Sequence, residues 1–278
     1  MIAIFPNTSK SQSKKLALGI VEFFTGKNIT VVSDEKEANI IGAKPLSQVS
    51  LTEIDFIISM GGDGTILRLA HRFSDHEIPI LGINLGHLGF MADIPLDDIY
   101  PSLQDLIDGN YTIEKRIMIE GESLEGEKAL AINDFVVHRA RNPSLVEIAI
   151  HVGGTYLNTF EADGVILATP SGSTAYSLAA GGPILMPELD AFALTPISPH
   201  TISNRPLVLS GDIELQIQYL SDYAPVEVIA DGMQTLKLST GGGFRLRKSK
   251  KHFHLVSLKR RDYFSTLRTK LGWSGKLR

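Results

Sequence analysis

The most constraining feature of the sequence is a glycine-rich turn between a short apolar run and a segment with helical spacing. The apolar run covers residues 54–60, the turn 61–65 and the helix-like segment 66–70. Glycine permits the backbone angles and close approaches that such a turn needs. A helix start also offers unpaired N–H groups and the positive end of a dipole, so the pattern predicts a strand–turn–helix unit whose turn binds an anion. The turn consists of Gly61, Gly62, Asp63, Gly64 and Thr65.

Asp63 is the unusual member of this turn, because it puts a negative charge where a phosphate is expected to sit. Two functional roles fit such an acid: a general base acting on a substrate hydroxyl, or a holder of the magnesium ion that accompanies a nucleotide. A structural alternative is an aspartate that caps the following helix. The five residues of the turn leave these alternatives open.

Composition excludes several classes of protein. With 278 residues and 43% hydrophobic content, the chain is long enough for one large domain or two ordinary ones with real cores. A net charge of −4 gives no electrostatic reason to expect nucleic acid or an anionic membrane as a partner. The chain has no cysteine, which excludes disulfides, thiolate metal sites and a cysteine nucleophile. It also has no signal-like N-terminus and no apolar stretch of about 18 residues, so we expect a cytoplasmic protein.

The first part of the chain alternates strand-like and helix-like segments, which predicts an α/β domain with a mostly parallel sheet. In such sheets, ligands bind outside the carboxyl ends of the strands. A second glycine-containing loop, residues 84–90, follows a strand predicted at 78–83, so we expect both glycine loops at one crevice. The other predicted strands are 2–5, 29–32, 39–42 and 54–60, and the predicted helices are 9–25, the segment after the turn, and 96–108.

Beyond residue 110 the apolar pattern changes to alternation, which predicts strands over most of the chain that follows. Two pairs, 153–154 and 231–232, are typical of hairpin turns, and short strands at this spacing indicate an antiparallel sandwich. Helical spacing returns at 262–272. We therefore predict a Rossmann-like α/β domain over 1–112, a β-rich, β-sandwich-like domain over 113–261, and a C-terminal helix and tail over 262–278 that pack back on the first domain.

Three polar clusters lie beside predicted strands: Asp63 in the turn, the pair Asn133 and Asp134, and Asp163 with the small-residue segment 169–177. Carboxylates that converge on a crevice can divide work, one taking a proton and the others accepting hydrogen bonds from sugar hydroxyls or coordinating a cation. The hydroxyls of the segment add donors. Its tyrosine offers a flat ring for a base, although a tyrosine beside small residues is more often a packing residue.

Taken together, these motifs resemble the NAD kinase family, whose members phosphorylate the 2′-hydroxyl of the adenosine ribose of NAD. The turn at 61–65 is a short signature shared with phosphofructokinases and diacylglycerol-type lipid kinases. Asp163 followed by residues 169–183 is similar, almost continuously, to the long NAD-binding segment of the NAD kinases. Residues 84–90, 133–134, 194–200 and 266–273 also look familial, so the resemblance spans nearly the whole chain.

The resemblance implies a role for each candidate residue. Asp63 would be the base on the ribose hydroxyl, and Gly61, Gly62, Gly64 and Thr65 would shape a phosphate-facing turn. The residues implied to bind NAD are Asp63 and Gly64 at the turn, Phe90 closing against the ligand, Asn133 and Asp134 at the nucleoside portions, Asp163 at the nicotinamide end, and Ser171, Thr174, Ala175 and Tyr176 around the adenine and ribose.

The same resemblance implies in-line transfer of a terminal phosphoryl group, in which the protein positions two substrates and stabilises charge. ATP would be the donor, and Mg²⁺ or another divalent metal would come with the donor phosphates, so no protein ligand is assigned to it. Members of the family form homodimers or homotetramers in which a neighbouring chain completes the NAD site. The chain departs from the family at Asp134, where many relatives have glutamate, and at Glu161, where some carry arginine or another residue that affects the choice between NAD and NADH.

Two other functions fit parts of the pattern. A lipid or sugar kinase shares the turn but would need the segment 163–183 to serve another acceptor. A non-catalytic dinucleotide sensor or a dehydrogenase would hold NAD without phosphorylating it, although the turn lacks the G-x-G-x-x-G spacing of a Rossmann dinucleotide site and Asp63 would repel a pyrophosphate there. The sequence leaves open the donor (ATP, polyphosphate or another triphosphate), the preference for NAD or NADH, the oligomer size, allosteric control, and the roles of Arg205 and His200.

Overall fold

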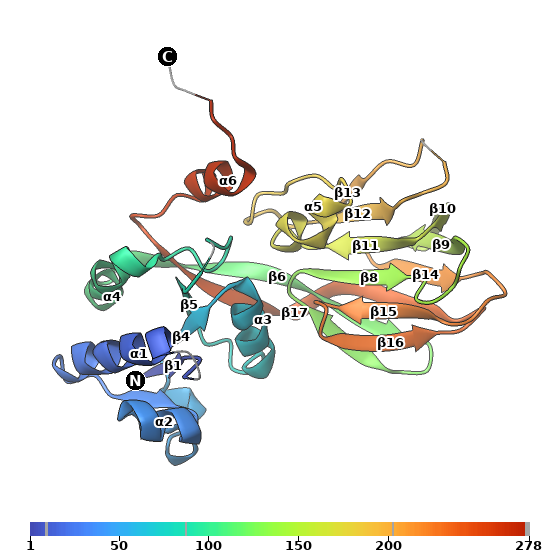
Figure 1. Ribbon diagram of the computed structural model, residues 1–278. Helices are drawn as coiled ribbons and strands as arrows, with labels where there is room; N and C mark the ends of the chain where they lie inside the picture. The colour runs from blue at the N-terminus through green and yellow to red at the C-terminus, as the bar shows by residue number, and fades with distance from the viewer. Residues whose placement is uncertain (9–10, 87, 202, 276–278) are drawn as a thin grey trace. The chain divides into compact units, whose positions relative to one another are not determined.

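The computed structural model of the chain describes residues 1–8, 11–86, 88–201 and 203–275. These residues form two compact units (Figure 1). Unit 1 consists of Met1–Lys115 together with the C-terminal part from Phe253, and unit 2 consists of Arg116–His252. Unit 1 contains alternating strands and helices, and unit 2 is built almost wholly of strands. The predicted combination of a Rossmann-like α/β part and an all-β part is therefore confirmed.

Unit 1 is built on a parallel sheet of short, buried strands. The strands are β1 (Ile2–Phe5), β2 (Val31–Ser33), β3 (Lys44–Pro45), β4 (Phe56–Gly61), β5 (Ile80–Asn84) and the end of β17 (Gly243–Leu258). Their order is β3-β2-β1-β4-β5-β17, and the pairs are parallel. The order of the strands reverses between β1 and β4. Open α/β sheets leave a ligand-binding crevice at the carboxyl ends of the strands where this reversal occurs.

Helices cover both faces of this sheet, as the alternation of elements predicts. The helices are α1 (Ser11–Thr25), α2 (Glu35–Ile41), α3 (Asp63–Arg72) and α4 (Ile99–Asp108). Alternate strand residues such as Ile4 and Ile58 share one core with Phe24 of α1 and with α4. On the other face, Phe73 at the end of α3 packs against Phe5 of β1 with ring centroids 5.5 Å apart. The strand–turn–helix unit predicted around residues 61–65 is confirmed, since β4 ends at Gly61 and α3 begins at Asp63.

The strand predicted at 39–42 is wrong, because these residues end helix α2. Ala38 and Ile41 are the buried residues of this helix, and their spacing of three puts them on one helix face. Gly42 ends the helix with φ of 74°, a left-handed conformation that glycine adopts without steric cost. So short an apolar run fits a strand or a helix, and the sequence did not separate them. Of the helix predicted at 9–25, residues 9 and 10 lie outside the described part of the chain.

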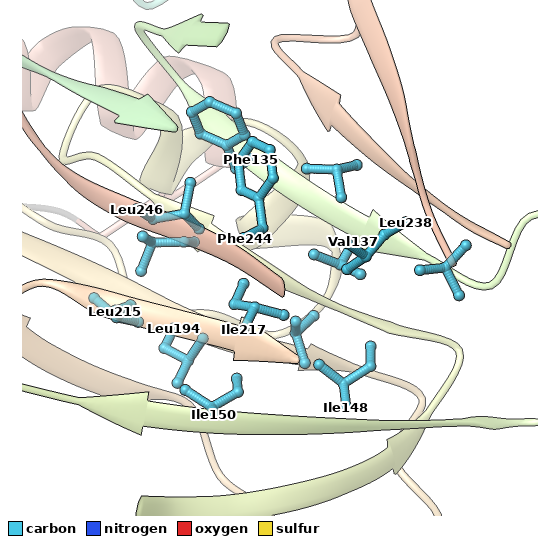
Figure 2. Packing of buried hydrophobic residues seen from close by; sticks show 14 of the residues in the cluster. Phe135, Val137, Ile148, Ile150, Leu194, Leu215, Ile217, Leu238, Phe244 and Leu246 are labelled. Carbon is cyan, nitrogen blue, oxygen red and sulfur yellow. The ribbon is translucent and has the colours of Figure 1, made fainter. Parts of the chain in front are cut away.

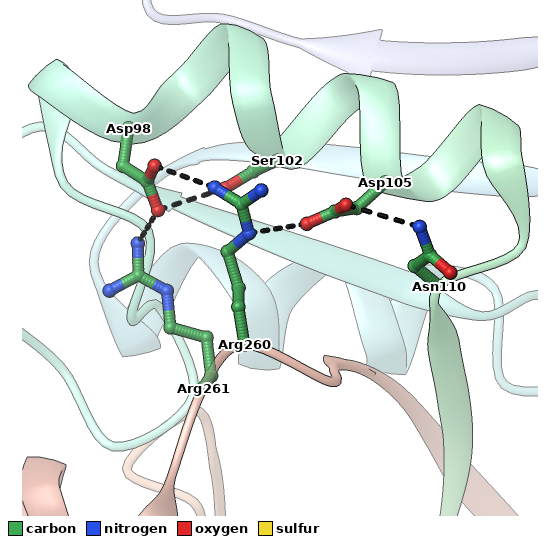
Figure 3. A network of polar contacts seen from close by, with 6 residues as sticks. All are labelled: Asp98, Ser102, Asp105, Asn110, Arg260 and Arg261. Carbon is green, nitrogen blue, oxygen red and sulfur yellow. Dashed lines mark hydrogen bonds and ion pairs between the residues drawn. The ribbon is translucent and has the colours of Figure 1, made fainter.

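The C-terminal helix α6 (Tyr263–Leu271) belongs to unit 1, in line with the expected packing on the first domain. The chain that enters it is attached to α4 by a network of ion pairs (Figure 3). Arg260 donates to Asp98 at 3.0 Å and pairs with Asp105, and Arg261 pairs with Asp98. Two arginines and two aspartates far apart in the sequence thus fix where the tail of the chain runs.

Unit 2 contains two sets of antiparallel strands. One sheet has the order β13-β12-β11-β8-β15-β16, and the other set has the order β10-β9-β14-β17, with β6 paired to β17 and to β7. The elements are β6 (Tyr111–Ser123), β7 (Lys128–Ala131), β8 (Asp134–His138), β9 (Val146–Val152), β10 (Thr155–Ala162), β11 (Gly164–Ala168), α5 (Tyr176–Ala179), β12 (Ala191–Ile197), β13 (Leu207–Ser210), β14 (Leu215–Tyr219), β15 (Val226–Ala230) and β16 (Gln234–Leu238).

The two sets of strands share one hydrophobic core (Figure 2). Phe135 of β8 and Phe244 of β17 lie with ring centroids 5.8 Å apart, and Ile148 and Ile150 of β9 belong to the same cluster. Side chains that point inward from two facing sheets are the defining feature of a β-sandwich. The predicted antiparallel sandwich is therefore confirmed.

The boundaries between the units differ from the sequence-based ranges. Tertiary contacts divide the chain after residues 115 and 252, whereas the apolar pattern of the sequence predicted divisions after 112 and 261. Strands β6 and β17 both run across the division without a break, so alternation of apolar residues cannot mark it. The two hairpin turns lie as predicted, with positive φ at Gly153 and Gly154 between β9 and β10 and at Asp231 and Gly232 between β15 and β16.

Candidate active site

The candidate residues fall into two groups, one in each unit. In unit 1, β4 and β5 are parallel neighbours with Gly61 opposite Asn84, so both glycine loops start at the same edge of the sheet. The N–H of Leu85 also donates to the carbonyl of Gly61 at 3.4 Å. The predicted meeting of the two loops is confirmed, although His87 lies outside the described residues. The ring of Phe90 lies at the end of the second loop, with the ammonium of Lys270 from α6 at 5.5 Å from its centroid.

The carboxylate of Asp63 is held by the second loop. Its Oδ2 accepts a hydrogen bond from the N–H of Phe90 at 2.8 Å, and its Oδ1 accepts from the N–H groups of Met91 and Ala92 at 3.1 and 2.8 Å. A Cβ added at Gly89 would overlap Oδ1, so only glycine allows the loop to approach this closely. Three consecutive backbone amides therefore fix the position of the carboxylate at the start of α3.

Asp63 does not cap its helix, because the N-cap position is Gly62 and no side chain bonds there. Each carboxylate oxygen has two lone pairs. Both lone pairs of Oδ1 are used by amides, whereas Oδ2 accepts one amide and keeps a lone pair for a ligand. A Cβ added at Gly62 or Gly64 would meet no protein atom within 4 Å, so the turn leaves open space on either side of Asp63. Gly61 differs from them, since a Cβ there would overlap the side chain of Thr65.

A cleft of about 830 Å³ opens beside this turn within unit 1. Its walls come from the loops that follow β1, β2, β4 and β5, which places it at the reversal of strand order described above. Charged side chains of both signs line it, together with the backbone of the glycine turn. The lining includes Pro6, Asp34, Gly62, Arg68, Arg72 and Leu85.

Asp93 is a titratable residue in this region that no sequence motif marks. Burial raises the pKa of its carboxyl group to about 6, against the opposing effect of the Arg261 guanidinium. The charges of Glu114 and Asp63 raise the pKa further. Asp93 directly follows the three residues that hold the Asp63 carboxylate, so its protonation can affect the potential at that site.

In unit 2, the pair Asn133 and Asp134 meets the small-residue segment. The N–H of Thr169 donates to the carbonyl of Asn133 at 2.8 Å, and its hydroxyl donates to the carbonyl of Ile132 at 2.6 Å. A Cβ added at Gly172 would overlap the Asn133 carbonyl, so the segment packs directly on this backbone. The side-chain Oδ1 of Asn133 is buried and has no hydrogen-bond partner among the described residues.

Asp134 and Asp231 form the acidic part of this group. Asp134 is 5% exposed, and burial, followed by the charge of Asp231, raises its pKa to about 7. The carboxylate of Asp231 accepts the N–H groups of Ile132, Asn133 and Asp134 at 2.8, 2.8 and 3.0 Å. The sequence marked Asp231 only as a hairpin residue, and no further signal in the pattern identifies its side chain as the support of the Asn133–Asp134 loop.

The segment 169–177 uses several buried hydroxyls for its own structure. The hydroxyl of Ser173 donates to the carbonyl of Pro170 at 2.6 Å, and Ser171 accepts from the buried Arg116 at 3.2 Å. The hydroxyl of Ser177 lies 3.0 Å from that of a threonine in β12. Thr174 and Ala175 are partly exposed, and Tyr176 is 44% exposed at the start of α5. In this segment the side chains at 174–176 are at least partly exposed, whereas Ser171 is buried and bonds Arg116.

Asp163 does not lie with these residues. It precedes β11, whereas Thr169 follows the same strand, so about 20 Å of extended chain separates them. Arg139 at the end of β8 donates from Nε to Asp163 Oδ1 at 2.6 Å. Near this end, His200 Nδ1 lies 3.4 Å from the Glu161 carboxylate, and both side chains are exposed. The sequence did not single out Arg139, whose pairing with Asp163 depends on strand register.

In the described parts of the chain, no three histidine or acidic side chains gather in a group that would hold a metal ion. Among the helices described, none has the length and apolar character needed to span a membrane. Arg205 is exposed in the loop before β13, and nothing in the structure assigns it a role.

A parallel sheet with a glycine-rich turn, and an aspartate fixed by amides at that turn, are typical of a phosphotransferase. Family models agree with this class: the ATP-NAD kinase N-terminal domain matches residues 2–111 and the ATP-NAD kinase C-terminal domain matches residues 132–258. An NAD kinase of Protochlamydia amoebophila is 58% identical over 278 residues, which is 100% of both chains. An NAD kinase of Moorella thermoacetica is 37% identical, covering 99% of this chain and 90% of the relative.

Solved structures agree as well. Yeast NADH kinase complexed with NADH superposes with a TM-score of 0.86 at 27% identity, covering 100% of this chain and 89% of the other. An NAD kinase from Archaeoglobus fulgidus in complex with ATP gives a TM-score of 0.77 at 26% identity, covering 99% and 100%. The chain belongs to the ATP-NAD kinase family.

Proposed function

We propose that this chain transfers the terminal phosphoryl group of ATP to the 2′-hydroxyl of the adenosine ribose of NAD, forming NADP, with Asp63 as the base. The observation that carries this assignment is the Asp63 carboxylate, held by three amides with a lone pair of Oδ2 left for a ligand. A ribose hydroxyl is a weak nucleophile. A fixed carboxylate within hydrogen-bond reach orients it and takes its proton as the new phosphorus–oxygen bond forms.

The donor phosphates are assigned to the backbone of the turn 61–65, where Gly62 and Gly64 leave room for them. We assign no protein ligand to the divalent metal, such as Mg²⁺, which would be held mainly by the donor phosphates. When bound there, the metal neutralises charge on the phosphates. The chain itself contributes the amides of the turn and the guanidinium of Arg68, which lies 3.3 Å from the hydroxyl of Thr65.

NAD is assigned to the residues of unit 2 together with Phe90 and the turn of unit 1. Asn133 supports this assignment, because its buried Oδ1 has no partner among the described residues and suits an amine or hydroxyl donor of the nucleoside. Ser171, Thr174, Ala175 and Tyr176 would enclose the adenine and ribose, and the exposed Tyr176 ring offers a stacking surface. The related yeast structure contains NADH, and the related archaeal structure contains ATP.

At the nicotinamide end we assign Asp163. Arg139 donates to its Oδ1, and we assign the other oxygen to the carboxamide of the ligand. The exposed pair Glu161 and His200 adjoins this end, and its charge is the feature we expect to influence the choice between NAD and NADH. The distance along β11 between Asp163 and residues 171–176 supports a site completed by a second copy of the chain, as in a homodimer or homotetramer.

Exposed apolar side chains also support the proposed homodimer or homotetramer. Tyr156, Leu157 and Val208 are 56%, 37% and 54% exposed, and they lie on β10 and β13, which end the two strand orders of unit 2. Light scattering will measure the mass of the particle in solution, and we expect a dimer or tetramer. A cytoplasmic location fits the absence of cysteine, and fractionation of cells that express the chain will test it.

The activity is tested by incubating the protein with Mg²⁺, ATP and NAD and measuring NADP. We expect NADP to form with NAD and not with lipid or sugar acceptors. If NAD binds but no NADP appears, the chain is a sensor and the proposed reaction is wrong. Replacing Mg²⁺ by a chelator is expected to stop NADP formation, and activity that persists would remove the metal from the proposal.

A further inference from the structure

We propose that the cleft of unit 1 holds the nucleoside of the phosphoryl donor, and that Asp34 accepts hydrogen bonds from the donor ribose hydroxyls. The donor is then a nucleoside triphosphate, and inorganic polyphosphate is a poorer ligand. This inference rests on the proposed kinase function and adds to it a residue that determines the donor class.

The position of the cleft follows from the order of the strands. The sheet runs β3-β2-β1-β4-β5, so the connections from β1 and β4 leave in opposite directions and their carboxyl ends diverge. Nucleotides bind at this point in doubly wound α/β sheets. The loops after β1 and β4 both line the cleft, and its volume of about 830 Å³ lies within the range of small-molecule sites.

Asp34 stands where such sheets place a ribose-binding acid. It directly follows β2, and its side chain lines the cleft. In dinucleotide-binding folds the acid that hydrogen-bonds the ribose lies about 20 residues after a glycine-rich turn in the first strand–helix unit. Here the glycine-rich turn follows β4 and Asp34 precedes it in the chain, so Asp34 resembles that acid in its place after a strand of the sheet and not in its spacing from the turn. In this sheet, β2 is the neighbour of β1 on the side away from β4. Asp34 therefore faces the cleft from the side opposite the phosphate-facing turn.

Arg72 fixes the orientation of the Asp34 carboxylate. The guanidinium donates to Oδ2 at 2.7 Å and to Oδ1 at 2.6 Å, and it lies 5.2 and 5.0 Å from the ring centroids of Phe5 and Phe73. Such a two-point pair fixes the carboxylate plane. Each oxygen still has a second lone pair, so the pair can accept two hydroxyl hydrogens, as a ribose diol presents them.

The charges in the cleft indicate which end takes the phosphates. Arg68 lies beside the turn, where its Nη2 donates to the Thr65 hydroxyl at 3.3 Å. At the other side, Asp34 and Glu37 are acids, and Glu37 accepts from the Thr8 hydroxyl at 3.4 Å. Phosphates placed near these acids would be repelled, whereas neutral hydroxyls would be bound. The cleft therefore matches a ligand that is anionic at the turn and hydroxylated near Asp34.

Calorimetry with Mg²⁺-ATP and Mg²⁺-tripolyphosphate tests the assignment on the full chain. We expect Asp34→Ala to weaken ATP binding by about 10- to 100-fold, the usual loss for hydrogen bonds to a charged group. Tripolyphosphate binding should not weaken, because the change frees the positive Arg72. Asp34→Asn, which keeps the side-chain shape, should give a smaller loss of the same kind. Glu35→Gln, a neighbouring acid that does not line the cleft, is the matched control and should change neither affinity.

An equal loss of ATP and tripolyphosphate affinity in Asp34→Ala would overturn the assignment, as would a rise in the KM for NAD with ATP affinity unchanged. The latter result would place the acceptor in the cleft. Thermal melting of each variant checks that it is folded. The outcome for the reaction itself is separate: a wild-type chain that binds ATP with the expected Asp34 dependence but makes no NADP would refute the kinase function and leave the cleft assignment intact.

Discussion

Unit 1 and unit 2 each contain a carboxylate that accepts three consecutive backbone N–H groups, and the two units use this arrangement in different ways. In unit 1 the carboxylate of Asp63 accepts three consecutive amides, those of residues 90–92. In unit 2 the carboxylate of Asp231 accepts three consecutive amides, those of residues 132–134. In each unit these hydrogen bonds join a loop to an acid that is distant in sequence. The loop adopts one defined shape in each case, because three N–H groups converge on two oxygens.

The difference lies in which acid faces the ligand. Asp63 is held by the amides and is itself the residue assigned to the substrate. In unit 2 the roles are divided, because Asp231 holds the loop and Asp134, on that loop, is assigned to NAD. The side chain of Asp134 accepts none of these three N–H groups, and burial raises its pKa to about 7. In both units two amides bind one carboxylate oxygen and one amide binds the other, so the same hydrogen-bonding pattern holds an acid assigned to the substrate in unit 1 and an acid that supports a neighbouring acid in unit 2.

The largest expected effect is that of Asp63→Asn. We expect kcat for NADP formation to fall by about two to four orders of magnitude, because an amide cannot accept the proton of the ribose hydroxyl. Steady-state kinetics with saturating NAD and ATP will measure it. Asp55→Asn, which replaces an exposed acid of the same unit, is the control and should leave kcat unchanged.

Asp63→Asn also weakens the hydrogen bonds to the N–H groups of residues 90–92, since the side-chain nitrogen of asparagine cannot accept a hydrogen bond. The two effects are separable by binding: the base role predicts that NAD and ATP still bind to the folded variant with little change. A variant that keeps near wild-type kcat would show that the proton goes elsewhere, and Asp93 would then be the next residue to replace.

Gly89→Ala tests whether the position of the Asp63 carboxylate matters, without removing the carboxylate. The added methyl would overlap Asp63 Oδ1, so the carboxylate must move. A displacement of about 1 Å at the reacting group can cost about 100-fold in rate, and we expect kcat to fall by that order with a smaller change in KM. Gly275→Ala, whose methyl meets no atom within 4 Å, is the control. An unchanged kcat in Gly89→Ala would mean that the exact position of the carboxylate does not matter.

The sequence predicted much of the fold because its patterns are local. Short apolar runs rich in isoleucine identified β1, β4 and β5, the last two followed by glycine-containing loops, and alternation identified the strands of the sandwich. The segment at 39–42 was misassigned because four residues do not separate a strand from the end of a helix. The unit boundaries were displaced because β6 and β17 continue across them, and only tertiary contacts divide a continuous strand.

The candidate site was predictable in part. The turn around Asp63 carries its own signal, since an acid among glycines at a helix start is unusual. Asp231 and Arg139 carry none, because their roles depend on which strands pair and in which register. Asp231 has the local pattern of any hairpin residue, and its carboxylate reaches residues 132–134 only because β15 pairs with β8. Asp34 was not singled out either, since its place beside the cleft follows from strand order.

Asp231 is the corresponding test in unit 2. Its φ of 50° suits glycine and asparagine. We expect Asp231→Gly, which removes all three acceptor contacts, to raise the KM for NAD by about 10- to 100-fold, while the KM for ATP stays the same. Asp231→Asn keeps an oxygen that can accept from residues 133 and 134 and should have a smaller effect. Asp222→Ala, an exposed acid of unit 2, is the control. Equal increases in both KM values would assign Asp231 a general structural role.

The smallest expected effect is a pH dependence of stability from Asp134. Its pKa is about 7 in the folded protein and about 3.9 in an unfolded chain, so between these values the folded state holds a proton that the unfolded state has lost. Folding stability from this group therefore falls as pH rises through this window and becomes constant about one pH unit above the folded pKa. Asp134→Asn lacks this proton, so its stability relative to wild type should rise by about 1–2 kcal/mol between pH 5 and 7. Urea unfolding of both proteins at several pH values will measure the difference. A difference that is constant with pH would mean that Asp134 is ionised in the folded protein, and unit 2 would then present a charged acid as unit 1 does.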